Sequence, residues 1–375
     1  MHRKELPMSE NKERSLSEII NDLSKNVMFR LSLTSKELFH SNFLAWIFET
    51  YKRECSEVFG ITELKDESTK IIREDNIGKN ENGKKCIADI VIQNGSDKII
   101  IENKFKCLPD LNQLKDYLIC NPQKIILLSY FEPLFNNELE NINCSYLSYK
   151  QLEGKLSELV KIINDQDNKI IIKNYIECLN LLNEIKNSIK LEDDITLGKM
   201  WDLITNNDIK TKLSAINFDK TMQRIYAIKL TNYILSDYDK RKILTVFIGC
   251  GRDLTVYSDI VFCYKNAWAK NEDEREKLNY LGVSVWGTNF RYYASLNNKK
   301  FSFNKNDREK GQNKLEQDYN WFFKNDKKWG GYCYDKEMYL YQKESIANLT
   351  LGKLKSKVHE LLNIIYEKEN KNFDL

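Results

Sequence analysis

The sequence predicts an α/β protein with a mixed sheet flanked by helices, followed by a helical segment and then a β-rich α+β region. Between residues 69 and 163, short apolar runs alternate with amphipathic helical segments, which is typical of a layered α/β unit. From Lys242 onward, the chain is instead rich in aromatic residues grouped in short strand-like runs. A length of 375 residues favours more than one domain.

These patterns divide the chain into three expected regions. Residues 1–165 should form the α/β domain, residues 166–240 a helical connector, and residues 241–375 a C-terminal α+β domain that binds substrate or regulates the first. The first boundary follows from the element order, because helix, three strands, helix, two strands and helix make one complete sandwich of about 150 residues.

Two helices should open the α/β domain. In residues 15–25 apolar residues recur at helical spacing, and a serine at the start can cap the helix. A second helix over about 35–51 carries a wide apolar stripe, with Glu37 in its first turn. Glu37 either compensates the helix dipole or adds a carboxylate to a site elsewhere in the domain. His40, which follows in the same helix, is more typical of a packed residue than of a catalytic one.

Three strands joined by turns are expected next, over residues 69–75, 86–93 and 98–104. Asn94-Gly95, between the second and third strands, is a strong signal for a two-residue hairpin turn. The third strand is nearly all isoleucine at its centre, which indicates burial on both faces of a mixed sheet. The remaining elements of the domain are a helix over about 110–120, strands over 124–130 and 144–147, and a helix from Ser148 to about Ile163.

The second half of the chain gives a weaker functional signal. Residues 170–189, 196–235 and 344–367 should be helical. Five runs between residues 242 and 304 read as strands, and residues 321–335 are aromatic and rich in turn residues. Aromatic and basic residues gather between 286 and 341, where they could stack bases and hold phosphates. We favour the alternative that these aromatic residues form the core of β structure, and a regulatory or partner-docking domain is equally consistent.

Composition excludes several classes of protein. The N-terminal sequence MHRKELPMSENKERS lacks the apolar core of a signal peptide, and no run approaches the ~20 apolar residues of a membrane span. Nine cysteines without a C-x-x-C pair favour reduced thiols over disulfides or a zinc site. We therefore expect a cytoplasmic protein with no membrane association. A net charge of +3 neither requires nor excludes nucleic acid.

Charged residues inside the apolar strands are the strongest functional signal. Glu102 and Lys104 are two positions apart and project from the same face of the third strand, whereas Asn103 points the other way. The hairpin turn can bring Asp89, in the second strand, close to Glu102. Two neighbouring carboxylates repel each other, and a divalent cation resolves that conflict.

This set of groups suits phosphodiester hydrolysis. Asp89 and Glu102, with the main-chain carbonyl of Asn103, can bind Mg²⁺, for which Mn²⁺ can substitute. Lys104 can orient the attacking water, help to remove its proton or offset charge that develops on phosphorus. The alternative is an exposed hairpin with ordinary charge pairs, which explains poorly why Glu102 and Lys104 follow three isoleucines.

At these positions the sequence resembles the PD-(D/E)XK nuclease superfamily, which includes restriction endonucleases, junction resolvases and RecB-like nucleases. Asp89 matches the acid of the first motif, although Ala88 stands where the name-giving proline would be. Glu102, Asn103 and Lys104 match the (D/E)XK part.

Three further residues extend the resemblance. Gln113 and Tyr117 are similar to the Q-x-x-x-Y motif of the RecB-like branch, whose residues lie near the substrate. Glu37 matches the position of an additional acidic ligand in many members, so the resemblance implies Glu37 as a further metal ligand.

The resemblance covers about residues 30–165 and implies a restriction-endonuclease-like core that cleaves nucleic acid, in particular DNA, with Mg²⁺. The helix sequence ELFHSNFLAW is also similar to a bacterial subgroup often associated with phage-defence loci, which implies a role in antiviral defence. The alternative is a catalytically silent or partner-activated module that binds nucleic acid on the same scaffold. A partner protein or a homo-oligomer is compatible with either function.

Overall fold

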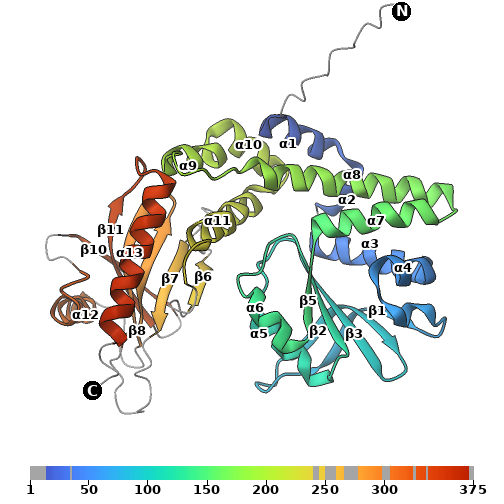
Figure 1. Ribbon diagram of the computed structural model, residues 1–375, viewed down its shortest axis with the longest axis horizontal. Helices are drawn as coiled ribbons and strands as arrows, with labels where there is room; N and C mark the ends of the chain where they lie inside the picture. Colours follow the sequence, from blue (N-terminus) through green and yellow to red (C-terminus); the bar gives the residue numbers. More distant parts are fainter. Residues whose placement is uncertain are drawn as a thin grey trace, which may run out of the picture. The chain divides into compact units, whose positions relative to one another are not determined.

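The computed structural model describes residues 14–33, 36–239, 245–249, 259–265, 278–297, 305–323, 327–334 and 337–370 (Figure 1). The chain divides into two compact units. The first comprises residues 1–188 and 211–218, and the second comprises residues 189–210 and 219–375. The helices predicted as a separate connector are therefore shared between the two units.

The first unit contains a five-stranded mixed sheet with the strand order β1-β2-β3-β4-β5. Strands β1 to β3 pair antiparallel, and β3, β4 and β5 pair parallel. The mixed sheet predicted from the sequence is confirmed, and Gly95 has the positive φ of 59° that its hairpin turn requires. The strands are β1 (Lys70–Lys79), β2 (Lys85–Asn94), β3 (Asp97–Lys104), β4 (Lys124–Ser129) and β5 (Cys144–Ser148).

Helices flank this sheet, and they include elements that the sequence did not predict. The short helices α2 and α4 were missed because they are too short or too polar for a clear apolar period. The helical elements are α1 (Leu16–Lys25), α2 (Val27–Ser32), α3 (Lys36–Thr50), α4 (Lys52–Phe59), η1 (Thr62–Lys65), α5 (Leu111–Asp116), η2 (Tyr117–Cys120), α6 (Asn136–Leu139), η3 (Glu140–Ile142), α7 (Tyr149–Ile162) and α8 (Gln166–Ser188).

The central strand β3 is buried on both faces, as the isoleucine run predicted. Ile99, Ile100 and Ile101 are each at most 3% exposed. On one face Ile100 packs in a cluster with Leu114 of α5 and Tyr117 of η2. Helix α3 packs on β1, β2 and β3. The centre of β3 therefore lies in the core of the unit, and Glu102, which follows the three isoleucines, is held away from bulk water.

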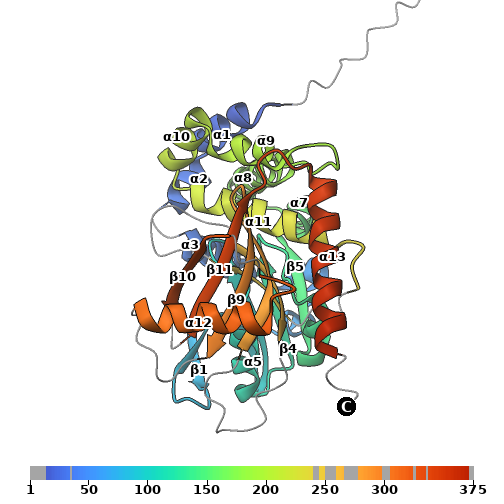
Figure 2. The ribbon, with the colours of Figure 1, turned by 90° about the vertical axis from the view of Figure 1, so that its left-hand side faces the viewer.

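The second unit contains a six-stranded antiparallel sheet with the strand order β10-β11-β9-β8-β7-β6. Figure 2 turns this unit toward the viewer, with α12 drawn across its strands. A side chain at Gly311 of α12 would press against Met338 and Leu340 of β11 and Leu296 of β9, so this helix packs closely on the sheet. The elements are α9 (Leu197–Thr205), α10 (Asn207–Ala215), α11 (Asp219–Leu235), β6 (Thr245–Gly249), β7 (Asp259–Lys265), β8 (Leu278–Trp286), β9 (Asn289–Asn297), α12 (Lys305–Asp318), β10 (Trp329–Tyr334), β11 (Glu337–Ser345) and α13 (Leu351–Asn370).

The closing helix begins later than predicted. Glu344 and Ser345 pair with Phe290 and Asn289 in the ladder between β11 and β9, so they belong to a strand. The helix starts only after Thr350, whose hydroxyl accepts a hydrogen bond from the N–H of Lys353 at 3.4 Å.

The aromatic residues between 286 and 341 lie mostly in the core of the second unit. Phe290, Tyr293 and Phe323 are each at most 1% exposed. Arg291 is buried too, and its guanidinium lies 4.1 Å from the ring centroid of Trp286 on one side. These contacts support the interpretation of these aromatic residues as core residues, although residues 305–318 of the same region form helix α12, which the sequence did not predict. Lys324, also considered for phosphate binding, lies outside the described residues.

Two further sequence predictions can be compared with the structure. No helix in the described parts of the chain is both long and apolar enough to cross a membrane. The cysteines whose side chains are described form no disulfide, as expected from the scattered spacing: Cys55, Cys86, Cys107, Cys120, Cys144 and Cys178.

Candidate active site

The candidate site lies where strands β2 and β3 part. Their pairing ends at Ile90 and Ile101, so Asp89 and Glu102 occupy the next positions of the same register. There the backbone N–H of Asn103 donates to Oδ2 of Asp89, at 2.7 Å. The Asp89 carboxylate thus replaces a strand as the hydrogen-bond partner, and the ladder ends at a charged group.

The backbone on the other side of Asp89 is also irregular. Glu74 of the edge strand β1 has a positive φ of 49°, which is uncommon for a residue with a side chain. It falls between the paired positions Arg73–Ile90 and Asp75–Ala88, directly beside Asp89. This distortion could not be predicted from the sequence, because neither glycine nor asparagine stands at position 74.

Glu102 is the most heavily bonded group of the site. It is 2% exposed, and its Oε1 lies 2.6 Å from Nζ of Lys104. Gln113 donates from Nε2 to the same oxygen at 2.8 Å, and the Tyr117 hydroxyl donates to Oε2 at 2.6 Å. The structure therefore brings Lys104, Gln113 and Tyr117, all predicted as site residues, into direct contact with Glu102.

The electrostatics reflect this crowding of charges. Burial, followed by the charge of Glu102, raises the pKa of Asp89 to about 7, against the N–H of Asn103 and the charge of Lys104. Burial acts to lower the pKa of Lys104, but Glu102 outweighs it, so that this pKa is raised. Burial and then Glu102 raise the pKa of Tyr117, which keeps its proton. The site holds two acids and one amine in a poorly solvated place.

The side chain of Asn103 points away from these groups, as its place between Glu102 and Lys104 predicted. Its Nδ2 donates to the main-chain oxygen of Glu37 at 3.1 Å and to Oγ of Ser41 at 3.0 Å. Its Oδ1 accepts from the hydroxyl of Tyr149 at 2.8 Å. Asn103 could therefore contact a metal only through its main-chain carbonyl, which is the group that the sequence suggested.

Glu37 reaches the backbone that follows Lys104. Its Oε1 accepts hydrogen bonds from the N–H groups of Lys106 at 2.7 Å and Cys107 at 2.9 Å. Within the described residues, no three side chains of His, Cys, Asp or Glu form a group that could hold a metal ion. The structure thus brings Asp89 and Glu102 together, but it does not add Glu37 to them as a third ligand.

The donor set fits a hard divalent cation that keeps much of its water. Two carboxylates and a main-chain carbonyl are all oxygen ligands. The pKa of Asp89 is raised by burial first and then by the charge of Glu102, and a bound cation would relieve the repulsion between these two acids. Mg²⁺ is commonly held by one or two carboxylates together with waters and substrate phosphate, which suits two acids better than a closed protein cage would.

Sequence reasoning missed Ser41 and Tyr149, which bind Asn103 from α3 and α7. A buried asparagine in an apolar strand is a signal that polar partners exist, but their positions depend on long-range packing. His40 is fully buried and bonded through Nδ1 to the Tyr175 hydroxyl at 2.7 Å, in line with a packed role.

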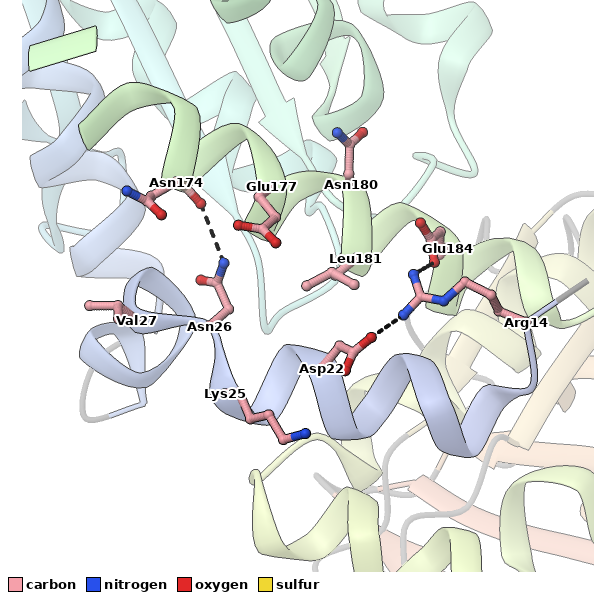
Figure 3. Close-up of a pocket in the computed structure, with 10 residues that line it drawn as sticks. All are labelled: Arg14, Asp22, Lys25, Asn26, Val27, Asn174, Glu177, Asn180, Leu181 and Glu184. Carbon is pink, nitrogen blue, oxygen red and sulfur yellow. Dashed lines mark hydrogen bonds and ion pairs between the residues drawn. The ribbon is translucent and has the colours of Figure 1, made fainter. Parts of the chain in front are cut away.

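A separate polar pocket of about 590 Å³ lies between α1, α2 and α8 (Figure 3). Arg14 pairs there with Asp22 and, at 2.7 Å, with Glu184. None of the predicted site residues lines this pocket, and the side chains of Arg14, Asp22 and Glu184 are partly exposed and paired with each other.

Comparisons with known proteins leave the family open. No family model matches the chain, and no curated protein matches it. Among solved structures, the crystal structure of a protein of unknown function, AF1548, aligns with 45% of this chain and 98% of that chain. The sequence identity is 10% and the TM-score is 0.21, so this similarity carries no argument about function.

Proposed function

We propose that this protein is a magnesium-dependent nuclease of the PD-(D/E)XK type, with a restriction-endonuclease-like first unit, that hydrolyses phosphodiester bonds of DNA. The observation that carries the proposal is the cluster of the buried Glu102 with the half-buried Asp89 and Lys104 at the fork between β2 and β3. Buried like charges with a perturbed pKa destabilise a fold, and such groups concentrate at functional sites.

Each residue has a defined part in this proposal. Asp89 and Glu102, with the carbonyl of Asn103, would hold the cation, and the cation would in turn bind the scissile phosphate. Bound Mg²⁺ polarises the phosphoryl oxygen and lowers the pKa of a water ligand. Lys104, 2.6 Å from Glu102, contributes positive charge where negative charge develops on the phosphate oxygens.

Gln113 and Tyr117 hold Glu102 in this proposal. Gln113 Nε2 also donates to the Tyr117 hydroxyl at 2.8 Å, so the two side chains act as one unit. Because each donates to a different oxygen of Glu102, the carboxylate plane is fixed before any ligand arrives.

One observation favours a second candidate, a nucleic-acid-binding module that is silent or needs a partner to become active. Both oxygens of Glu102 already accept hydrogen bonds, from Lys104, Gln113 and Tyr117. A cation must share these oxygens or displace Lys104, and a partner could be needed to drive that change.

Cleavage assays with the purified chain test the proposal directly. Plasmid DNA, linear DNA and RNA are incubated with Mg²⁺, Mn²⁺ or EDTA. We expect metal-dependent cleavage of DNA that Asp89→Asn and Lys104→Ala each reduce at least 10³-fold, because each removes a group that acts on the transition state. Lys124→Ala, which changes an exposed lysine of β4, is the matched control and should cleave normally.

One result would decide against the enzyme, and another against the role of Lys104. If neither metal supports cleavage of any substrate while the protein still binds DNA, the binding module is the better description. Full activity in folded Lys104→Ala would remove Lys104 from the proposed chemistry. A role in antiviral defence predicts that cells carrying the wild-type chain restrict phage plating and that cells carrying Lys104→Ala do not.

A further inference from the structure

The segment that follows β3 connects Lys104, at the end of that strand, with Gln113 and Tyr117, which bind Glu102 from the next helices. It runs from Lys104 to α5, which carries Gln113, and on to Tyr117, so its position sets how these groups meet Glu102. The end of β4 holds the start of the segment, because the N–H of Tyr130 donates to the carbonyl of Lys104 at 2.9 Å.

Glu37 holds the same segment from the other side. Its Oε1 accepts from two consecutive N–H groups, those of Lys106 and Cys107. A carboxylate that accepts two main-chain hydrogen bonds makes stronger bonds than a neutral acceptor would, and it fixes two consecutive peptide groups at once. The first turn of α3 is thereby attached to the backbone just past Lys104.

Asn103 binds the main chain of Glu37, whereas Lys106 and Cys107 bind its carboxylate. Both amide hydrogens of Asn103 are used, on the Glu37 carbonyl and on Ser41 Oγ, and Tyr149 donates to its oxygen. Rotating the amide by 180° would set Oδ1 against the carbonyl oxygen of Glu37, so only one orientation satisfies all partners. Ser41 itself donates to the Glu37 carbonyl at 3.0 Å.

These contacts form a closed set that we call the Glu37 brace: Glu37, Ser41, Asn103, Tyr149 and the N–H groups of Lys106 and Cys107. The brace joins α3, β3 and α7, and the N–H of Asn103 extends it to Asp89. The residue between Glu102 and Lys104 therefore transmits the position of α3 to Asp89 and to the segment that leads to Gln113.

We propose that Glu37 is a positioning residue that holds the backbone after Lys104, and that it is not a metal ligand. The inference rests on the proposed nuclease function and defines how its metal site is kept in place. Its basis is the bonding of Oε1 to two N–H groups and the lack, within the described part of the chain, of a three-carboxylate group able to hold a metal.

Substitutions at Glu37 separate the two roles. Glu37→Gln keeps an oxygen that can accept both N–H groups but is a poor ligand for Mg²⁺, whereas Glu37→Ala removes the acceptor. We expect Glu37→Gln to bind Mn²⁺ about as well as the wild type in the absence of nucleic acid. Glu37→Ala should bind it roughly 10-fold more weakly, as is typical when a group that orients ligands is lost. Glu49→Gln, exposed on the same helix, is the matched control.

Hydrogen exchange supplies a readout that does not depend on metal or activity. The amides of Lys106 and Cys107 should exchange faster in Glu37→Ala than in the wild type, and at near wild-type rates in Glu37→Gln. If Glu37→Ala does not fold, Glu37→Asp replaces it, because the shorter side chain keeps the charge but cannot reach both amides.

The outcomes are distinct. Equal loss of Mn²⁺ affinity in Glu37→Gln and Glu37→Ala would make Glu37 a ligand and overturn the proposal. Unchanged exchange at Lys106 and Cys107 in Glu37→Ala would show that the brace does not exist. A wild-type chain that binds no Mn²⁺ would remove the proposed metal site and the role of Glu37 in it, while the exchange data would still report on the contacts themselves.

Discussion

At the residue scale, Glu102 shows how a buried carboxylate is kept in one orientation. It is almost fully buried and accepts from Lys104, Gln113 and Tyr117. A buried charge without such partners would destabilise the fold by several kcal/mol. The same bonds that make burial tolerable also fix the direction in which the carboxylate can meet a cation.

We expect Tyr117→Phe to weaken both stability and cleavage. The substitution removes the donor to Oε2 of Glu102, which should lower the free energy of unfolding by about 1–3 kcal/mol. Cleavage and metal affinity should fall by roughly 10–100-fold, because the orientation of Glu102 is loosened. Denaturant melts and metal-dependent cleavage measure the two effects.

Tyr146→Phe is the control for that substitution. The Tyr146 hydroxyl in β5 is buried and has no hydrogen-bond partner among the residues that the structure describes, so its removal should leave stability and cleavage near the wild-type values. Equal behaviour of Tyr117→Phe and Tyr146→Phe would contradict the orienting role of Tyr117.

The sequence could predict which site residues share a face, but not what holds them. Strand alternation separates Glu102 and Lys104 from Asn103 because it depends only on local geometry. The partners of Asn103 lie 62 and 46 positions away, at Ser41 and Tyr149, and only the docking of α3 and α7 brings them near. Periodicity carries no information about such contacts.

At the element scale, the long and strongly patterned segments were predictable. The five strands of the first sheet follow from apolar runs and turn residues, whereas the distortion at Glu74 depends on how β1 meets β2 beside Asp89. The late start of α13 has a similar cause, because pairing with β9 keeps Glu344 and Ser345 in strand β11. Tertiary pairing there outweighs local propensity.

Glu344 links three elements of the second unit and should make its stability depend on pH. Its oxygens lie 2.7 Å from Nζ of Lys327 and 2.8 Å from Nζ of Lys357. Burial alone would raise the pKa of Glu344, but the hydrogen bonds from the two lysines outweigh it and hold the pKa below its ordinary range. The folded state therefore binds a proton at this carboxylate less readily than the unfolded state.

The sign of the effect follows from linkage. Above the ordinary carboxyl pKa, wild type should be more stable than Glu344→Gln, by about 1 kcal/mol for a partly exposed pair. That difference should disappear as the pH falls through the lower pKa of the folded state. Denaturant unfolding of both chains at a series of pH values measures it, with exposed Glu360→Gln of α13, the helix that carries Lys357, as control. A difference that grows toward acid pH would contradict the assignment.

At the scale of the whole molecule, the chain is two compact units with two sheets of different topology. The helices that lie between β5 and β6 along the chain were predictable as helices, because their apolar residues recur at helical spacing. Their division between the units was not, since an apolar face shows that a helix packs but not against what. The proposed chemistry belongs entirely to the first unit.

Metal binding should stabilise the protein without being needed for folding. Asp89 and Glu102 already have hydrogen-bond partners within the chain, so EDTA should leave the thermal midpoint unchanged. Mn²⁺ at 100 times its Kd should add about 2.7 kcal/mol to the unit that binds it. Calorimetry of the wild type and Asp89→Asn tests this, and an equal shift in both proteins would exclude Asp89 as a ligand.

The turn of Asn103 away from the acids has a consequence for control of the protein. Its main-chain N–H donates to Asp89, and its side chain donates to the main chain of Glu37 in α3. One residue therefore couples the docking of this helix to the geometry of the acids. A ligand or partner that tilts α3 would therefore shift the Asp89 carboxylate without binding at the fork between β2 and β3.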